Sequence, residues 1–229
     1  MTRSLTVAVL ALTICGCGAD DPTGGLPPAD AQLAVLNALP EGTLTSLVLD
    51  ENMITLPGQG TRIARVIPAG PHRLEARTQG GRVAASAHFS VAEGGRRTAI
   101  VGGTAGSDVV TLLVGADTAA IPMGNAVKVR VVHTVQGTPT LEAYLTPSAA
   151  PVNQGSRLWS PFSYGVSLTG EFPGYVVRAP GSYRIRITNQ ATAAIQTELI
   201  QEFQAGEVWS VILTRRTDGE LELLPIREH

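Results

Sequence analysis

The chain contains one sequence pattern twice, and this repeat limits the folds that it can adopt. Residues 31–37, Ala-Gln-Leu-Ala-Val-Leu-Asn, resemble residues 127–133, Val-Lys-Val-Arg-Val-Val-His. Farther along, Pro-Ala-Gly-Pro-His-Arg-Leu at 68–74 resembles Ala-Pro-Gly-Ser-Tyr-Arg-Ile at 179–185. A solenoid needs about three or more repeats to bury a continuous core. Two copies therefore predict two independent domains in tandem.

The periodicity inside each copy predicts β-strands. Valines alternate with basic residues from 127 onward, and apolar residues alternate with arginines over 183–187. A period of two with one charged face is typical of half-buried antiparallel strands. About six or seven such strands per copy, separated by turns such as Thr-Asp-Gly at 217–219, predict a small all-β sandwich. The basic residues of these strands are expected on outer faces, in surface ion pairs: Lys128, Arg130, Arg184 and Arg186.

Four short motifs of the second copy carry a family resemblance. They are Val131–His133, Glu142–Tyr144, Tyr164–Val166 and Ala179–Tyr183. The first copy keeps Pro-Ala-Gly at 68–70, but it has Asn37 in place of the histidine and His72 in place of the tyrosine. This pattern resembles the bacterial domain-of-unknown-function family 4397. The resemblance implies two tandem immunoglobulin-like antiparallel β-sandwiches in an envelope or secreted protein, and it implies no activity.

The N-terminal residues resemble the export signal of a bacterial lipoprotein. Arg3 supplies a positive charge, and the apolar run from Leu5 to Ile14 has about ten residues, where a membrane-spanning helix needs about 20. The run ends on Ile-Cys-Gly-Cys, which resembles a lipobox with small Gly16 before the cleavage point. Cys17 is therefore the predicted lipidation site and first mature residue. An ordinary cleaved signal and a buried helix are the alternatives.

Acyl chains on Cys17 would hold the protein in the cell envelope through the membrane. Gly18 follows the cysteine, and by analogy with enterobacterial sorting, where aspartate at that place favours the inner membrane, the outer membrane is expected. Gly, Pro and Asp dominate residues 18–30 and predict a flexible tether. The predicted organisation is a lipoprotein signal peptide at 1–16, lipidated Cys17 and tether at 17–30, a first β-sandwich at 31–115, a linker at 116–126 and a second β-sandwich at 127–226.

Composition argues against several function classes. Both cysteines lie at or before the cleavage point, so the folded body has no disulfide, no thiol nucleophile and no cysteine metal site. The formal charge is −2, and no basic stripe suggests a nucleic-acid partner. No two histidines share a short metal-binding motif, so neither a metal nor a cofactor is predicted.

No catalytic constellation is evident in the sequence. The segment Gly-Val-Ser-Leu-Thr-Gly at 165–170 fails at the last glycine of a nucleophile elbow. Pairs of glutamates flank Ile200 and Leu221, which predicts solvent-facing positions rather than acid–base chemistry. His133 is predicted to be a strand-end histidine that bonds a neighbouring loop. The rival hypothesis is a hydrolase of envelope polymers that uses His133 with a nearby carboxylate.

Aromatic residues gather in the second copy, which carries about fifteen more residues than the first. Trp159, Phe162 and Tyr164 lie in this additional segment, among Pro and Ser residues. Rigid aromatic surface suits a sugar ring or a protein partner, so these three are candidate binding residues. Alternatively, Trp159 and Phe162 fold back over their own core or over the interface with the first copy. The predicted function is non-enzymatic binding or scaffolding with an unknown envelope protein or glycan; the alternative is a dedicated glycan-binding module.

Overall fold

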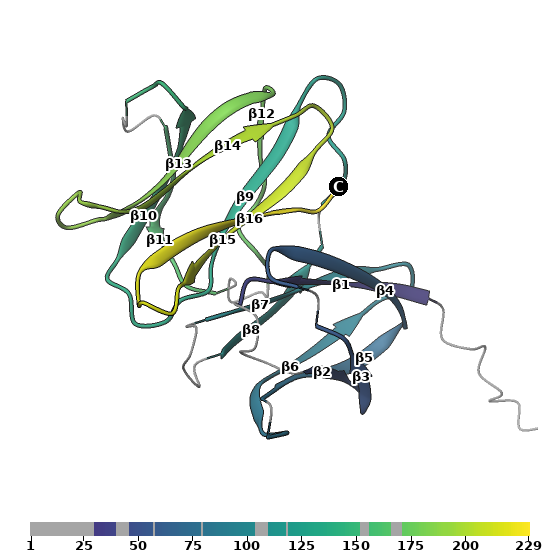
Figure 1. Cartoon of the computed structure of the whole chain (residues 1–229). Coiled ribbons are helices and arrows are strands. Elements are labelled where there is room, and N and C mark those ends of the chain that lie inside the picture. The colour runs from purple at the N-terminus through teal and green to yellow at the C-terminus, as the bar shows by residue number, and fades with distance from the viewer. Residues whose placement is uncertain are drawn as a thin grey trace, which may run out of the picture.

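The computed structural model describes residues 30–39, 46–56, 58–78, 80–103, 110–117, 119–151, 156–165 and 171–229. The predicted leader, Cys17 and nearly all of the predicted tether lie outside the described residues. The described chain is built of strands, which confirms the predicted all-β class (Figure 1). Within it, no helix is long and apolar enough to cross a membrane.

The first eight strands form a sandwich of two four-stranded sheets. They are β1 (Asp30–Asn37), β2 (Ser46–Leu49), β3 (Asn52–Ile54), β4 (Thr61–Pro68), β5 (Gly70–Arg77), β6 (Val83–Val91), β7 (Arg96–Gly103) and β8 (Val110–Ala116). One sheet has the order β4-β1-β7-β8 and the other β3-β2-β5-β6. Inward-facing aliphatic side chains such as Leu33, Leu47 and Leu74 fill the space between them.

The second sandwich repeats this arrangement strand by strand. Its strands are β9 (Val127–His133), β10 (Leu141–Pro147), β11 (Arg157–Phe162), β12 (Val176–Arg178), β13 (Gly181–Asn189), β14 (Ile195–Phe203), β15 (Val208–Arg215) and β16 (Leu221–Arg227). The sheets have the orders β12-β9-β15-β16 and β11-β10-β13-β14. Each copy thus has eight described strands where about six or seven were predicted. The excess arises because β3 and β12 have only three residues each, too few to show a period.

One strand pairing in each sandwich is parallel rather than antiparallel. β1 runs parallel to β7, and β9 runs parallel to β15. The other pairings in the described chain are antiparallel, as predicted. A parallel pair joins strands that are far apart in the sequence, so side-chain alternation within either strand does not reveal it.

The two sandwiches pack against each other through the outer faces of one sheet each. Successive side chains of a strand point to opposite faces, so Leu33 enters the first core while Leu36 points outward. Leu36 and Ile100 meet Val132 and Ile212 of the second sandwich in a third apolar cluster. Each sandwich thus has a core of its own, and each also covers an apolar face of the other.

At Gly102 the backbone of the first sandwich closely approaches a side chain of the second. A Cβ atom added to Gly102 of β7 would lie 2.3 Å from Oγ1 of Thr134, which directly follows β9. The Thr214 hydroxyl lies 3.2 Å from the carbonyl oxygens of both Ala38 and Gly103. Glycine at position 102 thus permits an approach that a larger residue would prevent.

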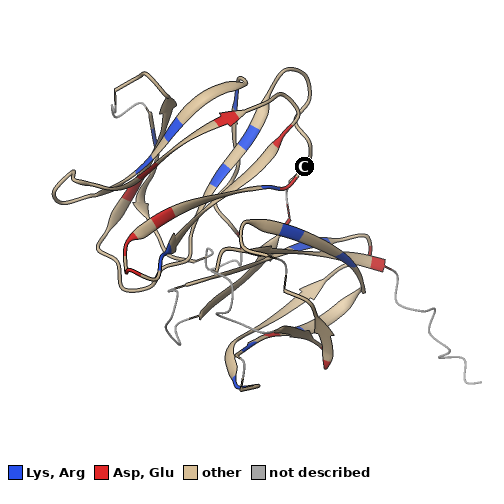
Figure 2. Cartoon of the chain, in the orientation of Figure 1, with Lys and Arg blue, Asp and Glu red and all other residues tan. Residues whose placement is uncertain are grey.

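Charged residues are distributed over both sandwiches (Figure 2). Arg184 and Arg186 of β13 lie 3.9 and 3.4 Å from the Glu198 carboxylate of the adjacent strand β14. These are the cross-strand ion pairs that the alternating pattern predicts, and Glu198 is exposed to solvent. The surface position predicted for Arg186 is wrong, because its side chain is buried and also donates a hydrogen bond to the Thr146 hydroxyl at 3.1 Å. Such pairs contribute little stability each.

Arg130 departs from the prediction of an exposed position. It points outward from β9, but it is fully buried, because residues 171–175 cover it. Its guanidinium lies 4.8 Å from the ring centre of Phe172 and 4.6 Å from that of Tyr175. It donates hydrogen bonds to Ser210 at 2.6 Å and to Glu228 at 3.0 Å. The outer face of a strand is a solvent face only where no other part of the chain covers it.

Candidate functional site

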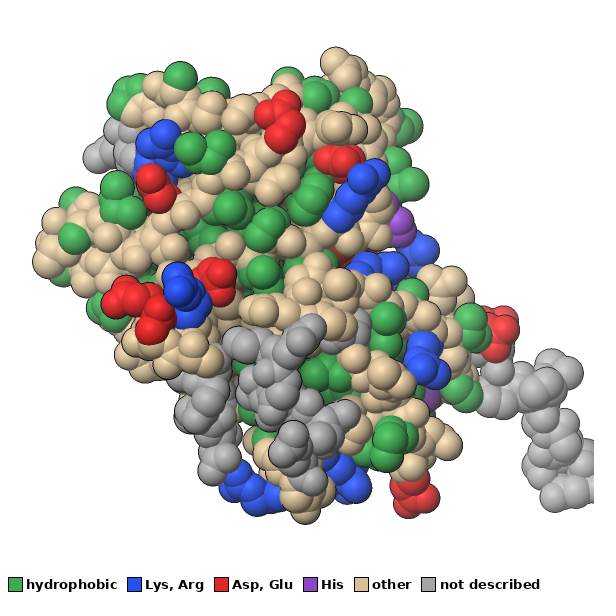
Figure 3. Space-filling model, viewed as in Figure 1, with side chains coloured by type: hydrophobic (Ala, Val, Ile, Leu, Met, Phe, Trp, Pro, Cys, Tyr) green, Lys and Arg blue, Asp and Glu red, His purple; other side chains and the backbone are tan. Residues whose placement is uncertain are grey.

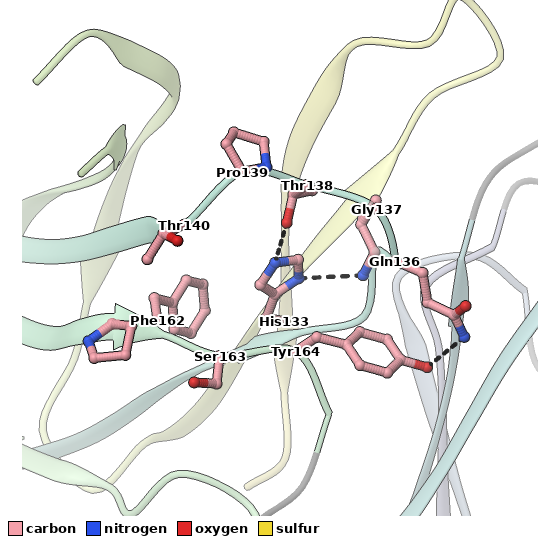
Figure 4. Close-up of a pocket in the computed structure, with 11 residues that line it drawn as sticks. His133, Gln136, Gly137, Thr138, Pro139, Thr140, Phe162, Ser163 and Tyr164 are labelled. Carbon is pink, nitrogen blue, oxygen red and sulfur yellow. Dashed lines mark hydrogen bonds between the residues drawn. The ribbon is translucent and has the colours of Figure 1, made fainter. Parts of the chain in front are cut away.

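A hollow of about 510 Å³ opens at the end of the second sandwich, where β9 and β11 end (Figure 4). Two segments line it: the connection from β9 to β10, over 133–140, and residues 161–164 at and beyond the end of β11. The same β9–β10 connection also carries Thr134, which lies next to Gly102 of the first sandwich. The hollow therefore lies close to the junction between the two sandwiches.

His133 lies at the base of this hollow and is 1% exposed. The backbone N–H of Val135 donates to its Nδ1 at 3.2 Å, so the proton resides on Nε2, which donates to the Thr138 hydroxyl at 3.0 Å. Burial lowers the pKa of His133 to about 4. The imidazole is thus neutral near pH 7, and it bonds the neighbouring loop as the sequence predicts.

This geometry does not support the hydrolase hypothesis. Both ring nitrogens of His133 are occupied by partners within its own loop. No carboxylate is among the described residues that line the hollow. A general base needs a free lone pair that can reach the substrate, and His133 has none.

Asn37 occupies the position in the first sandwich that His133 occupies in the second. Each residue ends the first strand of its copy. The Asn37 side-chain oxygen accepts the backbone N–H of Leu39 at 2.9 Å, just as His133 Nδ1 accepts that of Val135. A shared bond at equivalent positions identifies a structural role, which asparagine and histidine fill alike.

The three predicted binding residues differ in exposure. Phe162 is 3% exposed and belongs to the core of the second sandwich, and Trp159 packs partly buried against the same core. Tyr164 is 40% exposed. Phe162 and Tyr164 line the hollow together, whereas Trp159 does not. The alternative that Trp159 and Phe162 fold back over their own core therefore describes Phe162 fully and Trp159 in part. Tyr164 is the most exposed of the three.

A second hollow of about 300 Å³ adjoins the first. The two hollows share residues 161–164, and the second also reaches Trp159 and Glu171. All three predicted aromatics thus contact one of two neighbouring depressions. Their role in binding stays a prediction.

The Tyr164 hydroxyl connects the two sandwiches. It accepts a hydrogen bond from the Gln136 amide at 2.8 Å and lies 3.3 Å from the Thr111 hydroxyl on β8 of the first sandwich. The ring also packs edge-on against His133, at 6.1 Å between ring centres. Sequence reasoning missed Gln136 and Thr111. Gln136 lies in a polar segment that is typical of any turn. Thr111 belongs to the first copy, and its contact with Tyr164 depends on how the two copies pack.

Charged and apolar side chains are interspersed over the visible face of the molecule, without a face of one charge (Figure 3). Within the described chain, no group of three or more His, Cys, Asp or Glu side chains could hold a metal ion.

No family model matches this chain, and no curated protein does. Solved structures with some similarity include a candidate cell adhesion protein from Bacteroides eggerthii, with a TM-score of 0.27, 9% identity and coverage of 88% of this chain and 96% of that one. A structure of α-glucan recognition by family 41 carbohydrate-binding modules from streptococcal virulence factors has a TM-score of 0.27 and 13% identity, covering 83% and 94%. A candidate adhesin from Bacteroides ovatus has a TM-score of 0.22 and 9% identity, covering 92% and 98%. These scores are too low to carry an argument about function.

Proposed function

We propose that this protein is a lipid-anchored, non-enzymatic binding or scaffolding module of the cell envelope. The observation that carries the proposal is the pair of hollows at Tyr164, where residues of both sandwiches meet around one exposed ring. The two sandwiches share an apolar cluster, and the Tyr164 hydroxyl lies between them, so their packing positions this ring. Binding sites are commonly concave and mostly preformed.

The anchor is the second part of the proposal. Its support is the lipobox-like sequence that ends at Cys17, together with the resemblance of the body to family 4397 in its motifs. Acyl chains on Cys17 would hold the body at a membrane, with the outer membrane favoured over the inner. Cys17→Ser should shift the protein from the membrane fraction to the soluble fraction, as followed by immunoblot. Unchanged membrane association would contradict the anchor.

The binding function is tested by crosslinking the full-length protein in intact cells and identifying what is captured. We expect Tyr164→Ala to reduce capture of the partner strongly. Ile200→Ala is the matched control, because Ile200 is 53% exposed on β14 and lies outside both hollows. Equal capture by the two variants would show that the hollows are not the binding site.

A further inference from the structure

We propose that the two hollows at Tyr164 bind an uncharged, hydroxyl-rich ligand, namely a neutral oligosaccharide whose sugar rings contact the face of Tyr164. This inference rests on the proposed binding function and specifies the ligand of the same site. Four observations support it: the charge of the lining, its hydrogen-bonding groups, the held position of Tyr164 and the size of the hollows.

The larger hollow has an uncharged lining. None of its described lining residues is Asp, Glu, Lys or Arg, and the buried imidazole of His133 is neutral near pH 7. A charged ligand would lose hydration here without gaining an ion partner, which is unfavourable. The larger hollow therefore favours a neutral ligand over a phosphate, a uronate or a charged peptide.

The polar groups of the lining are ones that both donate and accept hydrogen bonds. They are the hydroxyls of Thr138, Thr140 and Ser163 and the amide of Gln136. Hydroxyls and amides match sugar hydroxyls, which also act in both roles. Gln136 uses its NH₂ group to bond Tyr164, which leaves its amide oxygen as an acceptor.

The ring of Tyr164 is held in place before any ligand arrives. Gln136 bonds its hydroxyl from within the second sandwich, and Thr111 lies within hydrogen-bond distance from the first. An aromatic ring that is already positioned loses little entropy when a ligand packs against it. The apolar face of a sugar ring offers the complementary flat surface, as aromatic residues at binding sites commonly use.

The size of the site suits more than one sugar unit. The hollows of about 510 and 300 Å³ share Pro161 to Tyr164 along their common border. Small-molecule pockets usually measure about 300–1,000 Å³. A chain of at least two rings would therefore pass along Tyr164 from one hollow into the other.

The test is calorimetric titration of the full-length protein in detergent with neutral cello-, malto-, manno- and chitooligosaccharides. Oligogalacturonate serves as the anionic counterpart. We expect at least one neutral oligosaccharide to bind, and Tyr164→Ala to weaken its binding about tenfold or more. Ile200→Ala should bind as the unaltered protein does. Since no ion pair forms in the larger hollow, affinity should stay constant between about 0.01 and 1 M salt, over which the Debye length falls from about 30 to about 3 Å.

Two further variants separate a local effect from unfolding. Tyr164→Phe keeps the ring but removes its contacts with Gln136 and Thr111, and Thr111→Val changes only the first sandwich. Thr111→Val should bind the sugar about two- to fivefold more weakly, which corresponds to the loss of one modest hydrogen bond, and Tyr164→Phe, which loses two contacts, should bind at least as weakly as Thr111→Val. If Thr111→Val and Tyr164→Ala both bind as tightly as the unaltered protein, the assigned position is wrong.

The outcomes distinguish this inference from the proposed function. Binding only to oligogalacturonate, with affinity that falls as salt rises, would overturn the neutral ligand. The protein could bind none of the sugars while Tyr164 is still required for capture of a protein partner in cells. This result would overturn the oligosaccharide proposal and leave the proposed binding function intact. Neither sugar binding nor Tyr164-dependent capture would overturn both.

Discussion

His133 and Asn37 occupy equivalent places at the ends of β9 and β1, yet only His133 is titratable. Its pKa of about 4 lies below the ordinary value of 6.5, because burial disfavours the charged imidazole. Below pH 6.5 the unfolded chain takes up a proton that the folded protein does not. Stability is therefore complete above about pH 6.5 and declines as the pH falls toward 4.

We expect the free energy of unfolding to fall by about 3 kcal/mol from this residue between pH 6.5 and 4, since each unit of pKa difference corresponds to about 1.4 kcal/mol. His133→Asn should keep the bond to Val135, as Asn37 keeps the bond to Leu39, and should remove most of that decline. Urea unfolding over this pH range measures it. The control is His88→Asn, at an exposed position; an equal flattening in both variants would contradict the assignment to His133.

Arg130 is the other residue whose surroundings decide its role. It pairs with Glu228, and both side chains are 0% exposed. The Tyr175 hydroxyl donates to the same carboxylate at 2.7 Å, and burial raises the pKa of Tyr175, so this donor keeps its proton. Among the described residues, Arg130 Nη1 and Glu228 Oε2 have no partner, so the pair is not fully satisfied.

Removing one member of this pair should be more damaging than removing both. Glu228→Gln leaves a buried, uncompensated guanidinium and should lower the free energy of unfolding by about 3–5 kcal/mol. The double variant Arg130→Met with Glu228→Gln should recover most of this loss, because it removes the charge. Chemical denaturation of the two single variants and the double variant tests this. A double variant that is less stable than either single variant would contradict it.

At the scale of elements, the chain repeats contacts as well as strands. His72 on β5 bonds the Pro68 carbonyl at 2.8 Å, and Tyr183 on β13 bonds the Ala179 carbonyl at 2.9 Å. Different residue types thus tie the same strand to the preceding turn in both copies. The short turn between β2 and β3 has no such twin, because the corresponding strands β10 and β11 are joined by a longer connection.

That hairpin turn consists of Asp50 and Glu51, with φ angles of 46° and 71°. Residues with side chains rarely adopt this left-handed backbone, which costs about 1–2 kcal/mol per residue. The Asp50 carboxylate lies 2.5 Å from the His72 ring and accepts a hydrogen bond from the Arg73 backbone N–H at 2.7 Å. These two contacts with β5 hold Asp50 in its strained conformation. Within the described contacts, Glu51 has no such role.

Glu51→Gly should therefore raise the free energy of unfolding by about 1 kcal/mol, because glycine adopts a positive φ without steric strain. Thermal and urea unfolding measure the change. Glu93→Gly is the control, since Glu93 also lies in a turn but is not among the residues with positive φ. A gain of similar size from Glu93→Gly would show that the effect does not arise from the backbone of the hairpin.

The sequence predicts those elements whose signal is local. The alternation at 127–133 and 183–187 predicts β9 and β13 of the second copy, and the repeat identifies their counterparts β1 and β5 in the first. The alternation placed Arg130 on the outer face, but it carried no information about Phe172 and Tyr175, which cover it. The same limit applies to the candidate site, because the contact between Thr111 and Tyr164 depends on how the two sandwiches pack.

At the scale of the whole molecule, the packing of one sandwich on the other determines what is buried. The outward residues Leu36 and Ile100 would be exposed on an isolated first sandwich, as Val132 and Ile212 would be on the second. Their burial stabilises the pair through the loss of apolar surface from water. We therefore expect the two sandwiches to unfold in a single cooperative transition rather than one after the other.

The contact between Gly102 and Thr134 offers a direct way to test this packing. In Gly102→Ala the new methyl group would lie 2.3 Å from Thr134 Oγ1 and 2.5 Å from its Cβ, so one sheet must move away from the other. We expect an increased radius of gyration in X-ray scattering and two separate unfolding transitions in calorimetry. Gly58→Ala is the matched control, because its nearest neighbour would be 3.9 Å away. Adding Thr134→Gly to Gly102→Ala removes the clashing atoms and should restore the compact form. Compact scattering and a single transition in Gly102→Ala alone would show that the interface adapts, and that Tyr164 does not depend on this contact for its position between the sandwiches.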